Sequence, residues 1–142
     1  MKRVFAVLLV ACGVAALAAL AAGCGSGGGG TPELDGTSWK LTGWSVSSQD
    51  PNDFTITAEF KDGTVAGKSA VNNYNGPYTV GPDDAFSAGP LASTKMAGPE
   101  ADMQAESTYL QLLEGAKSAQ RDGETLKLFD ADGNESLIYT VQ

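Results

Sequence analysis

The sequence of 142 residues contains no histidine, and its only two cysteines, Cys12 and Cys24, lie near the amino terminus. A Ser/His/Asp triad, a histidine general base and a zinc site of the usual cysteine and histidine type are therefore excluded after Cys24. If Cys24 is modified, the chain that follows it has no thiol for a disulfide or for a cysteine nucleophile. These absences predict a protein that is not an enzyme and that holds neither a metal nor a cofactor.

The start of the chain has the order of a bacterial lipoprotein signal. Two basic residues precede an apolar run over residues 4–22, and small residues then lead to Cys24. We therefore interpret residues 1–23 as a signal peptide, Cys24 as the site that receives lipid chains such as palmitate, and residues 24–32 as a flexible, glycine-rich tether. Cys12 follows too short an apolar stretch to be the lipidation site.

A transmembrane helix is the alternative interpretation of the same run, because about 20 apolar residues suffice to cross a bilayer. The position of the run, its many alanines and the glycine tract at residues 27–30 favour the signal peptide. Lipid on Cys24 would then hold the protein in the cell membrane or the outer membrane, on the extracytoplasmic face.

The chain after the signal is strongly acidic. All 17 acidic residues but only seven of the nine basic residues follow Cys24, which gives this part a net charge of −10. Such a body repels nucleic acid and anionic lipid headgroups. We therefore expect no nucleic-acid partner and expect the membrane to be contacted through the lipid alone. An envelope protein or a small molecule is the partner to expect.

Residues 33–142 form one expected domain dominated by β-strands. Apolar and polar residues alternate from Phe54 to Phe60, the pattern of a half-buried strand. The Asp62-Gly63 pair predicts a tight turn into a second strand, because glycine tolerates a positive φ. The other expected strands lie at residues 37–44, 64–68, 78–80 and 85–87, and around turns at 122–123 and 130–134. Seven or eight strands are predicted in all.

One segment has the period of a helix. A proline at the first position, acidic residues in the first turn and a glycine after the last turn predict a helix over about residues 99–114. Its apolar stripe, which should face the sheet, includes Glu106. A carboxylate there must be paired, hydrogen-bonded or protonated. We favour a structural role in which Glu106 binds backbone amides or Lys95 near Asn72. The alternative is a general acid or a ligand-binding carboxylate with a raised pKa.

Two sequence motifs resemble a known family. The stretch from Ala70 to Tyr78, AVNNYNGPY, resembles the GCNxYxGxY motif of the META domain, the HslJ-like family of bacterial envelope proteins. Residues 91–97, LASTKMA, followed by Met103 and Glu106, resemble the second signature of that family. The resemblance implies an α+β, mostly β fold, in which an antiparallel sheet curls into a half-open barrel with one packed helix. It also implies an envelope location and associations with stress or antibiotic tolerance, without an established catalytic reaction.

The motif cysteines of many family members correspond here to Val71 and Gly98. Any disulfide or thiol function found in such relatives is therefore absent from this chain. If the two cysteines are bonded to each other in relatives, the loss of both at once is explained.

The asparagine-rich part of the first motif supplies candidate binding residues. Asn72, Asn73, Tyr74 and Asn75 could present amides and a phenol to a polar ligand such as a glycan or a peptide. We favour instead a loop in which these side chains bind their own backbone. The candidate set for binding or structure is Asn72, Asn73, Tyr74, Tyr78, Lys95 and Glu106.

Two other groups of residues have simple structural interpretations. Trp44, at the end of an expected strand, is either an exposed contact for a partner or, more commonly, a cap on the core. Asp130, Asp132 and Asn134 suggest a calcium loop, but the position of the next glycine and the absence of a helix signal after it favour a hairpin turn.

Three functional classes follow. The favoured one is a lipid-anchored, non-catalytic binding or interaction module of the cell envelope. The second is a carrier of small hydrophobic ligands in the hollow of the barrel. The least favoured is a carboxylate-based glycan hydrolase, which needs two acids about 5 to 9.5 Å apart facing a cleft. Glu106 and Asp102 lie four positions apart on the expected helix, but nothing in the sequence perturbs Asp102.

Overall fold

The computed structural model describes residues 30–142, so the predicted signal peptide, Cys24 and most of the tether lie outside the described residues. Within them the chain forms nine strands and one α-helix, where seven or eight strands were expected. The elements are β1 (Thr37–Trp44), the 3-10 turn η1 (Pro51–Asp53), β2 (Thr57–Lys61), β3 (Thr64–Lys68), β4 (Asn73–Val80), β5 (Phe86–Ala88), β6 (Ala92–Ser93), α1 (Glu100–Gly115), β7 (Ser118–Asp122), β8 (Thr125–Phe129) and β9 (Glu135–Val141).

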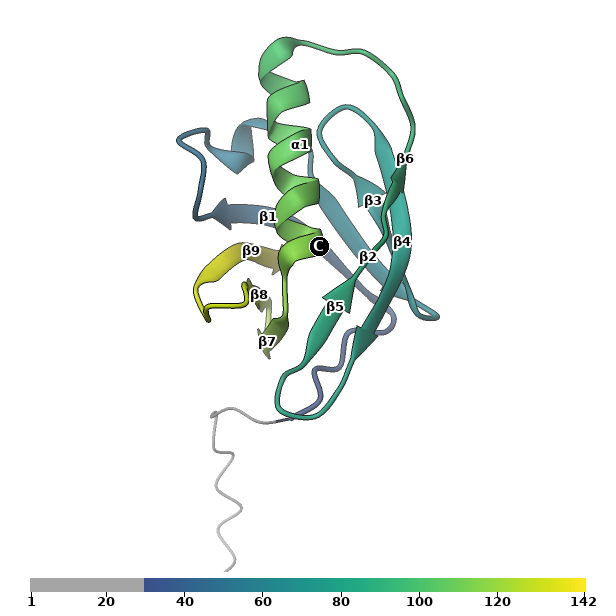
Figure 1. The fold of residues 1–142 in the computed structure, drawn as a ribbon, viewed down its shortest axis with the longest axis vertical. Coiled ribbons are helices and arrows are strands. Elements are labelled where there is room, and N and C mark those ends of the chain that lie inside the picture. Colours follow the sequence, from purple (N-terminus) through teal and green to yellow (C-terminus); the bar gives the residue numbers. More distant parts are fainter. Residues whose placement is uncertain (1–29) are drawn as a thin grey trace, which may run out of the picture.

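The strands form one antiparallel sheet that curls on itself. Their order is β5-β4-β3-β2-β1-β9-β8-β7, with the short β6 also beside β4. The two ends of the sheet meet where Ala85 bridges Ser118 and where the Phe86 amide donates to the Lys117 carbonyl at 3.0 Å. Helix α1 packs against one side of the curled sheet, where it contacts β5 and β9 (Figure 1). The expected barrel with one packed helix is therefore confirmed.

The β2–β3 hairpin follows from its turn residues. Asp62 and Gly63 have φ angles of 51° and 76°, which the expected two-residue turn requires. Ile56, Ala58 and Phe60 are all buried, so the alternation seen in the sequence does mark the inner face. The strand begins at Thr57, later than the alternation does, because the turn η1 ends only at Asp53. Ile56 still forms an antiparallel bridge with Ser69.

The asparagine-rich stretch is mostly a strand, and the expectation of a loop is wrong. β4 begins at Asn73, well before the strand that was expected at residues 78–80. Asn73 and Asn75 are exposed on the outer face, whereas Tyr74 and Tyr78 are buried on the inner face. The alternation is hard to see in the sequence because Gly76 holds an inward position that an apolar side chain would normally mark.

Helix α1 spans Glu100–Gly115, close to the predicted 99–114. Pro99 is the residue before the first turn instead of its first member, because its ψ of 145° is extended. Tyr109 and Leu113 are fully buried against the sheet, as the apolar stripe predicted. Ala105 and Glu106 are buried beside them.

The interior of the barrel is filled by large side chains. Trp39, Phe60, Tyr109 and Tyr139 each have a relative exposure of 0%. Trp44 is half-buried: its ring centroid lies 6.5 Å from that of Phe54, and its indole nitrogen donates to the Gln49 carbonyl at 2.8 Å. Trp44 therefore caps one end of the core, which was the commoner of its two interpretations.

Asp130 closes the turn that leads into β9. Its Oδ1 accepts hydrogen bonds from the amides of Asp132 at 2.9 Å and Asn134 at 3.0 Å. The hydrogen bond from the Asn134 amide is the main reason that the pKa of Asp130 lies below its ordinary value. The hairpin-turn interpretation of this segment is confirmed.

Candidate functional site

The carboxylate of Glu106 is the acceptor of four hydrogen bonds from one short segment. Its Oε2 accepts from the backbone amides of Val71 at 3.3 Å and Asn72 at 2.7 Å, and from the hydroxyl of Ser69 at 2.9 Å. Ala70, with a φ of 86°, turns the successive amides toward the same side, which makes the segment an anion-binding nest. The anion that fills this nest is a side chain of the protein itself.

Asn72 joins Glu106 to the segment that precedes α1. Its Nδ2 donates to Glu106 Oε1 at 2.8 Å and to the Met96 carbonyl at 3.1 Å. Its Oδ1 accepts from the Thr94 hydroxyl at 2.9 Å and from the Met96 amide at 2.7 Å. Every hydrogen-bonding position of this side chain is therefore used, and Asn72 is 1% exposed.

The surroundings of Glu106 favour its charged form. Burial alone would raise the pKa of Glu106, but the hydrogen bonds from residues 69–72 outweigh burial and hold the pKa below its ordinary value of 4.5. The expectation that Glu106 binds backbone amides near Asn72 is confirmed. Lys95, the other partner that was considered for Glu106, is exposed, and the side chains of Asn72 and Ser69 bind the carboxylate together with the amides.

Three buried tyrosines form a hydrogen-bonded chain that the sequence did not reveal. The Tyr74 hydroxyl lies 2.7 Å from the Thr57 carbonyl and 2.7 Å from the Tyr109 hydroxyl, which lies 3.1 Å from the Tyr139 hydroxyl. A carbonyl can only accept, so Tyr74 donates to Thr57. Because each hydroxyl has a single proton, Tyr109 then donates to Tyr74, and Tyr139 donates to Tyr109. Burial raises the pKa of all three phenols, so they remain protonated.

This direction of donation predicts unequal effects of removing single hydroxyls. Tyr139→Phe removes one hydrogen bond but leaves no donor without an acceptor, so it should lower the free energy of unfolding by about 0.5 to 1.5 kcal/mol. Tyr109→Phe leaves the buried Tyr139 hydroxyl without an acceptor and should cost about 1 to 3 kcal/mol. Chemical denaturation of both variants measures the difference. A larger loss for Tyr139→Phe would show that the chain runs the other way.

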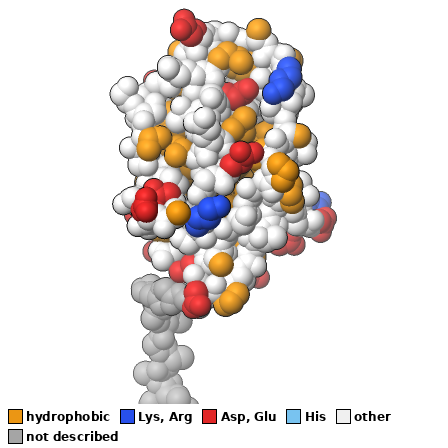
Figure 2. Space-filling model, viewed as in Figure 1, with side chains coloured by type: hydrophobic (Ala, Val, Ile, Leu, Met, Phe, Trp, Pro, Cys, Tyr) orange, Lys and Arg blue, Asp and Glu red, His pale blue; other side chains and the backbone are white. Residues whose placement is uncertain are grey.

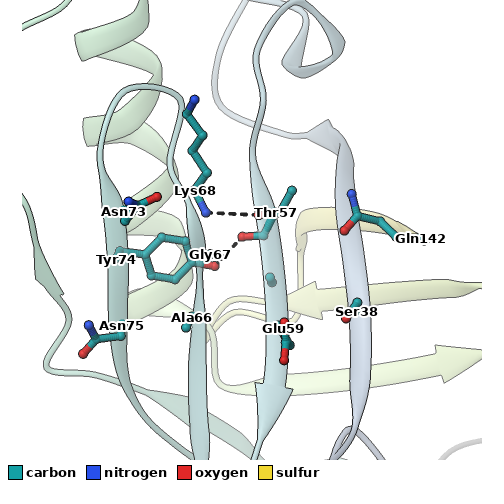
Figure 3. Close-up of a pocket in the computed structure, with 11 residues that line it drawn as sticks. Ser38, Thr57, Glu59, Ala66, Gly67, Lys68, Asn73, Tyr74, Asn75 and Gln142 are labelled. Carbon is teal, nitrogen blue, oxygen red and sulfur yellow. Dashed lines mark hydrogen bonds between the residues drawn. The ribbon is translucent and has the colours of Figure 1, made fainter.

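The outer face of β1–β4 carries an open groove of about 520 Å³. A cross-strand row runs through it, in which Ser38 pairs with Glu59, Glu59 with Ala66, and Ala66 with Asn75. The hollow exists because two members of this row, Ser38 and Ala66, have small side chains. Polar side chains surround it (Figure 3). These are Ser38, Glu59, Lys68, Asn73, Asn75 and Gln142.

The groove differs from the interior in how its polar groups are used. Among residues 30–142, the six polar side chains just named make no hydrogen bond or ion pair. Two other polar side chains that line the groove are engaged: the Thr57 hydroxyl accepts from the Lys68 amide at 3.0 Å, and the Tyr74 hydroxyl donates to the Thr57 carbonyl at 2.7 Å. The predicted candidates that line the groove are Asn73, Tyr74 and Asn75. Those that do not are Asn72, Tyr78, Lys95 and Glu106.

The described part of the chain shows neither a metal-binding cluster nor a membrane-spanning helix. Residues 30–142 contain no group of three or more acidic, cysteine or histidine side chains placed to hold a metal ion. No helix in the same range is long and apolar enough to cross a bilayer.

The sequence profile of the META domain matches residues 32–141. The chain belongs to the META domain family. No match was found among proteins of curated function. The fold is similar to that of a protein from Burkholderia xenovorans solved by NMR, with a TM-score of 0.63, 25% identity, and coverage of 77% of this chain and 83% of that one.

Two other solved structures share the fold at lower identity. One, determined by NMR, has a TM-score of 0.58 and 17% identity, and the match covers 76% of this chain and 91% of that one. The other is the crystal structure of a DUF4847 family protein from Bacteroides vulgatus, with a TM-score of 0.57, 14% identity and coverage of 75% and 93%.

The structure gives a packing reason for most positions of the META domain motif. The first glycine of the motif corresponds to Ala70. The φ of Ala70 is 86°, a conformation that favours glycine and costs alanine about 1 kcal/mol. A Cβ on Gly76 would lie 2.7 Å from the Pro90 carbonyl oxygen, so no larger residue fits there. Tyr78 packs edge-on against Phe60, with 4.9 Å between ring centroids. The motif therefore marks the core of this META domain more than a binding surface.

Proposed function

We propose that the protein is a lipid-anchored, extracytoplasmic envelope protein whose META domain is a non-catalytic binding module. One observation carries the binding role: the polar groups inside the domain are engaged with one another, whereas six polar side chains around the outer groove have no hydrogen bond or ion pair within the described chain. Side chains with unused hydrogen-bonding capacity around a hollow are what a ligand-binding surface requires. The anchor is supported by the signal-like segment that ends at Cys24.

The filled interior supports this role over that of a carrier. A carrier needs a hollow inside the barrel, but Trp39, Phe60 and Tyr139 occupy this space and have no solvent exposure. On the face shown in Figure 2, hydrophobic side chains form small separate groups and not one broad apolar patch. A polar partner or ligand therefore fits the surface better than a hydrophobic one.

The state of the carboxylates supports a non-catalytic role over glycan hydrolysis. A general acid needs a raised pKa, whereas the pKa of Glu106 is lowered by its hydrogen bonds despite burial. Glu59 is the one Asp or Glu side chain among the groove residues of the described chain, and the hydrolase mechanism needs two such side chains. A contribution to envelope stress or antibiotic tolerance, which the family resemblance implies, would then come from binding.

Labelling with radioactive palmitate tests the anchor. Cells that express the full-length protein should incorporate label, and Cys24→Ser should abolish it and leave the precursor uncleaved, because the acceptor thiol is lost. Cys12→Ser is the matched control and should retain full label. If Cys24→Ser remained labelled, or if the protein fractionated with the cytosol, the proposed location would be wrong.

A further inference from the structure

We propose that the outer groove binds a short, extended peptide with a free carboxylate, which lies across strands β1–β4. This inference rests on the proposed binding role and names the ligand class for it. The groove residues that carry it are Ser38, Glu59, Lys68, Asn73, Asn75 and Gln142.

The carboxamides of the groove match the backbone of a peptide. Asn73, Asn75 and Gln142 each present one carbonyl acceptor and two N–H donors. A peptide unit presents one donor and one acceptor, so a carboxamide can bind both at once. None of these three side chains has a hydrogen-bond partner within residues 30–142. The Asn73 backbone amide, by contrast, is held by the Thr94 hydroxyl at 3.2 Å, which fixes the start of β4.

The charged side chains of the groove favour a ligand that carries the opposite charges at its ends or on its side chains. Among the side chains that line it in the described chain, Lys68 is the one basic group and Glu59 is the one acidic group. The ion pair found among the described residues joins Lys127 to Glu135, so neither Lys68 nor Glu59 is neutralised by a neighbour. A single carboxylate suits Lys68, and an amine suits Glu59. A polyanion is disfavoured because the body after Cys24 carries a net charge of −10.

The dimensions of the row fit a peptide of about four residues. The paired positions from Ser38 through Glu59 and Ala66 to Asn75 cross three gaps between neighbouring strands. Neighbouring strands lie about 4.8 Å apart, which makes the row about 14 Å long, and an extended peptide advances about 3.4 Å per residue.

The chemistry of the groove favours a peptide over a glycan. Sugar rings commonly stack on an exposed aromatic face, and the one aromatic residue at the groove, Tyr74, is 2% exposed. Its hydroxyl is also engaged, since it donates to the Thr57 carbonyl at 2.7 Å (Figure 3). Only polar edges and small aliphatic side chains remain for contact with a ligand.

Calorimetric and NMR titration of the full chain in detergent with the peptide Ala-Gln-Lys-Ala tests the proposal. The peptide with free termini should bind and shift the backbone amide signals of Ala66 and Asn75. Lys68→Gln should weaken binding about threefold to fivefold, the effect of one exposed charge pair. Amidation of the peptide carboxylate should weaken binding to the unmodified protein by the same factor and should have no further effect on Lys68→Gln. Lys117→Gln, an exposed lysine outside the groove, is the matched control and should bind normally.

Each other outcome has a separate meaning. Absence of peptide binding, or equal binding by Lys68→Gln, overturns this inference. If a chitin-type oligosaccharide binds in the groove and the peptide does not, the proposal of a peptide ligand is wrong, and the proposed binding function of the domain is retained. Loss of palmitate label in the unmodified protein overturns the proposed anchor and leaves the titration result unaffected.

Discussion

Glu106→Ala should lower the free energy of unfolding at pH 7 by about 3 to 5 kcal/mol. The change removes the acceptor for the amides of Val71 and Asn72 and for the carboxamide of Asn72. A buried donor left without a partner costs about 1 to 3 kcal/mol. Ser69 contributes less to the loss, because its hydroxyl can donate to the Asn72 carbonyl, which lies 2.9 Å away.

Glu106→Gln isolates the contribution of the second carboxylate oxygen. The glutamine carbonyl can keep the bonds made by Oε2, but its amide group would then face the Asn72 Nδ2, which is also a donor. Asn72 cannot turn over, because its Oδ1 already accepts two hydrogen bonds from residues 94 and 96. We expect a loss of about 1 to 3 kcal/mol.

The same variants should differ in the pH dependence of stability. The pKa of Glu106 is lowered in the folded state, so its contribution is fully present above the unfolded-state value of 4.5 and is lost as the pH falls through the lower folded-state value. Urea denaturation between pH 7 and pH 3 should therefore show a steeper acid loss for the unmodified protein than for Glu106→Gln. Glu124→Gln, an exposed carboxylate, is the control and should follow the unmodified protein. Parallel curves for Glu106→Gln and the unmodified protein would contradict a lowered pKa.

The double variant Val71→Cys/Gly98→Cys should form a disulfide and raise the free energy of unfolding by about 3 to 4 kcal/mol. A Cβ built on Gly98 lies 3.5 Å from the Cβ of Val71, which is within the range of about 3.5 to 4.5 Å found in disulfides. The bond would close a loop of about 28 residues between the two positions. The expected gain in the free energy of unfolding is the loss of entropy that this loop closure causes in the unfolded chain. Val71 and Gly98, the positions that the motif resemblance matches to cysteines, are thus neighbours in the structure.

The controls separate the bond from the change in packing. The same double variant under reducing conditions should lose the gain. Gly98→Ala alone should be destabilised by about 1 to 3 kcal/mol, because its Cβ would lie 2.7 Å from Val71 Cγ2. Two thiols that stay free in the oxidised, folded double variant, as measured by thiol titration, would mean that the two positions are not adjacent.

The sequence predicted the elements whose causes are local. The Asp-Gly turns, the strand at residues 37–44 and the helix depend on neighbouring residues, and the place of Glu106 in an apolar stripe follows from helical spacing alone. Helical spacing does not predict the hydrogen-bond partners of Glu106, because Asn72 and Ser69 lie 34 and 37 residues away in the chain. The glycine at position 76 also hid the alternation of β4.

The tyrosine chain and the groove depend on tertiary structure and strand register. Tyr109 is 35 residues from Tyr74 and 30 residues from Tyr139, so only the packing of α1 on the sheet joins them. The groove exists because four neighbouring strands place small and polar residues in one row. Sequence periodicity gives the face of each residue but not its neighbour across the sheet.

Glu106 is an ionised, hydrogen-bonded structural group in this interpretation, and the outer groove is the candidate ligand surface. A carbon-13 NMR titration of the Glu106 side-chain carboxyl in the folded protein tests this most directly. We predict a midpoint below 4.5, because the hydrogen bonds from residues 69–72 outweigh burial. A midpoint above that value would contradict the account and would instead fit the general-acid role that we reject.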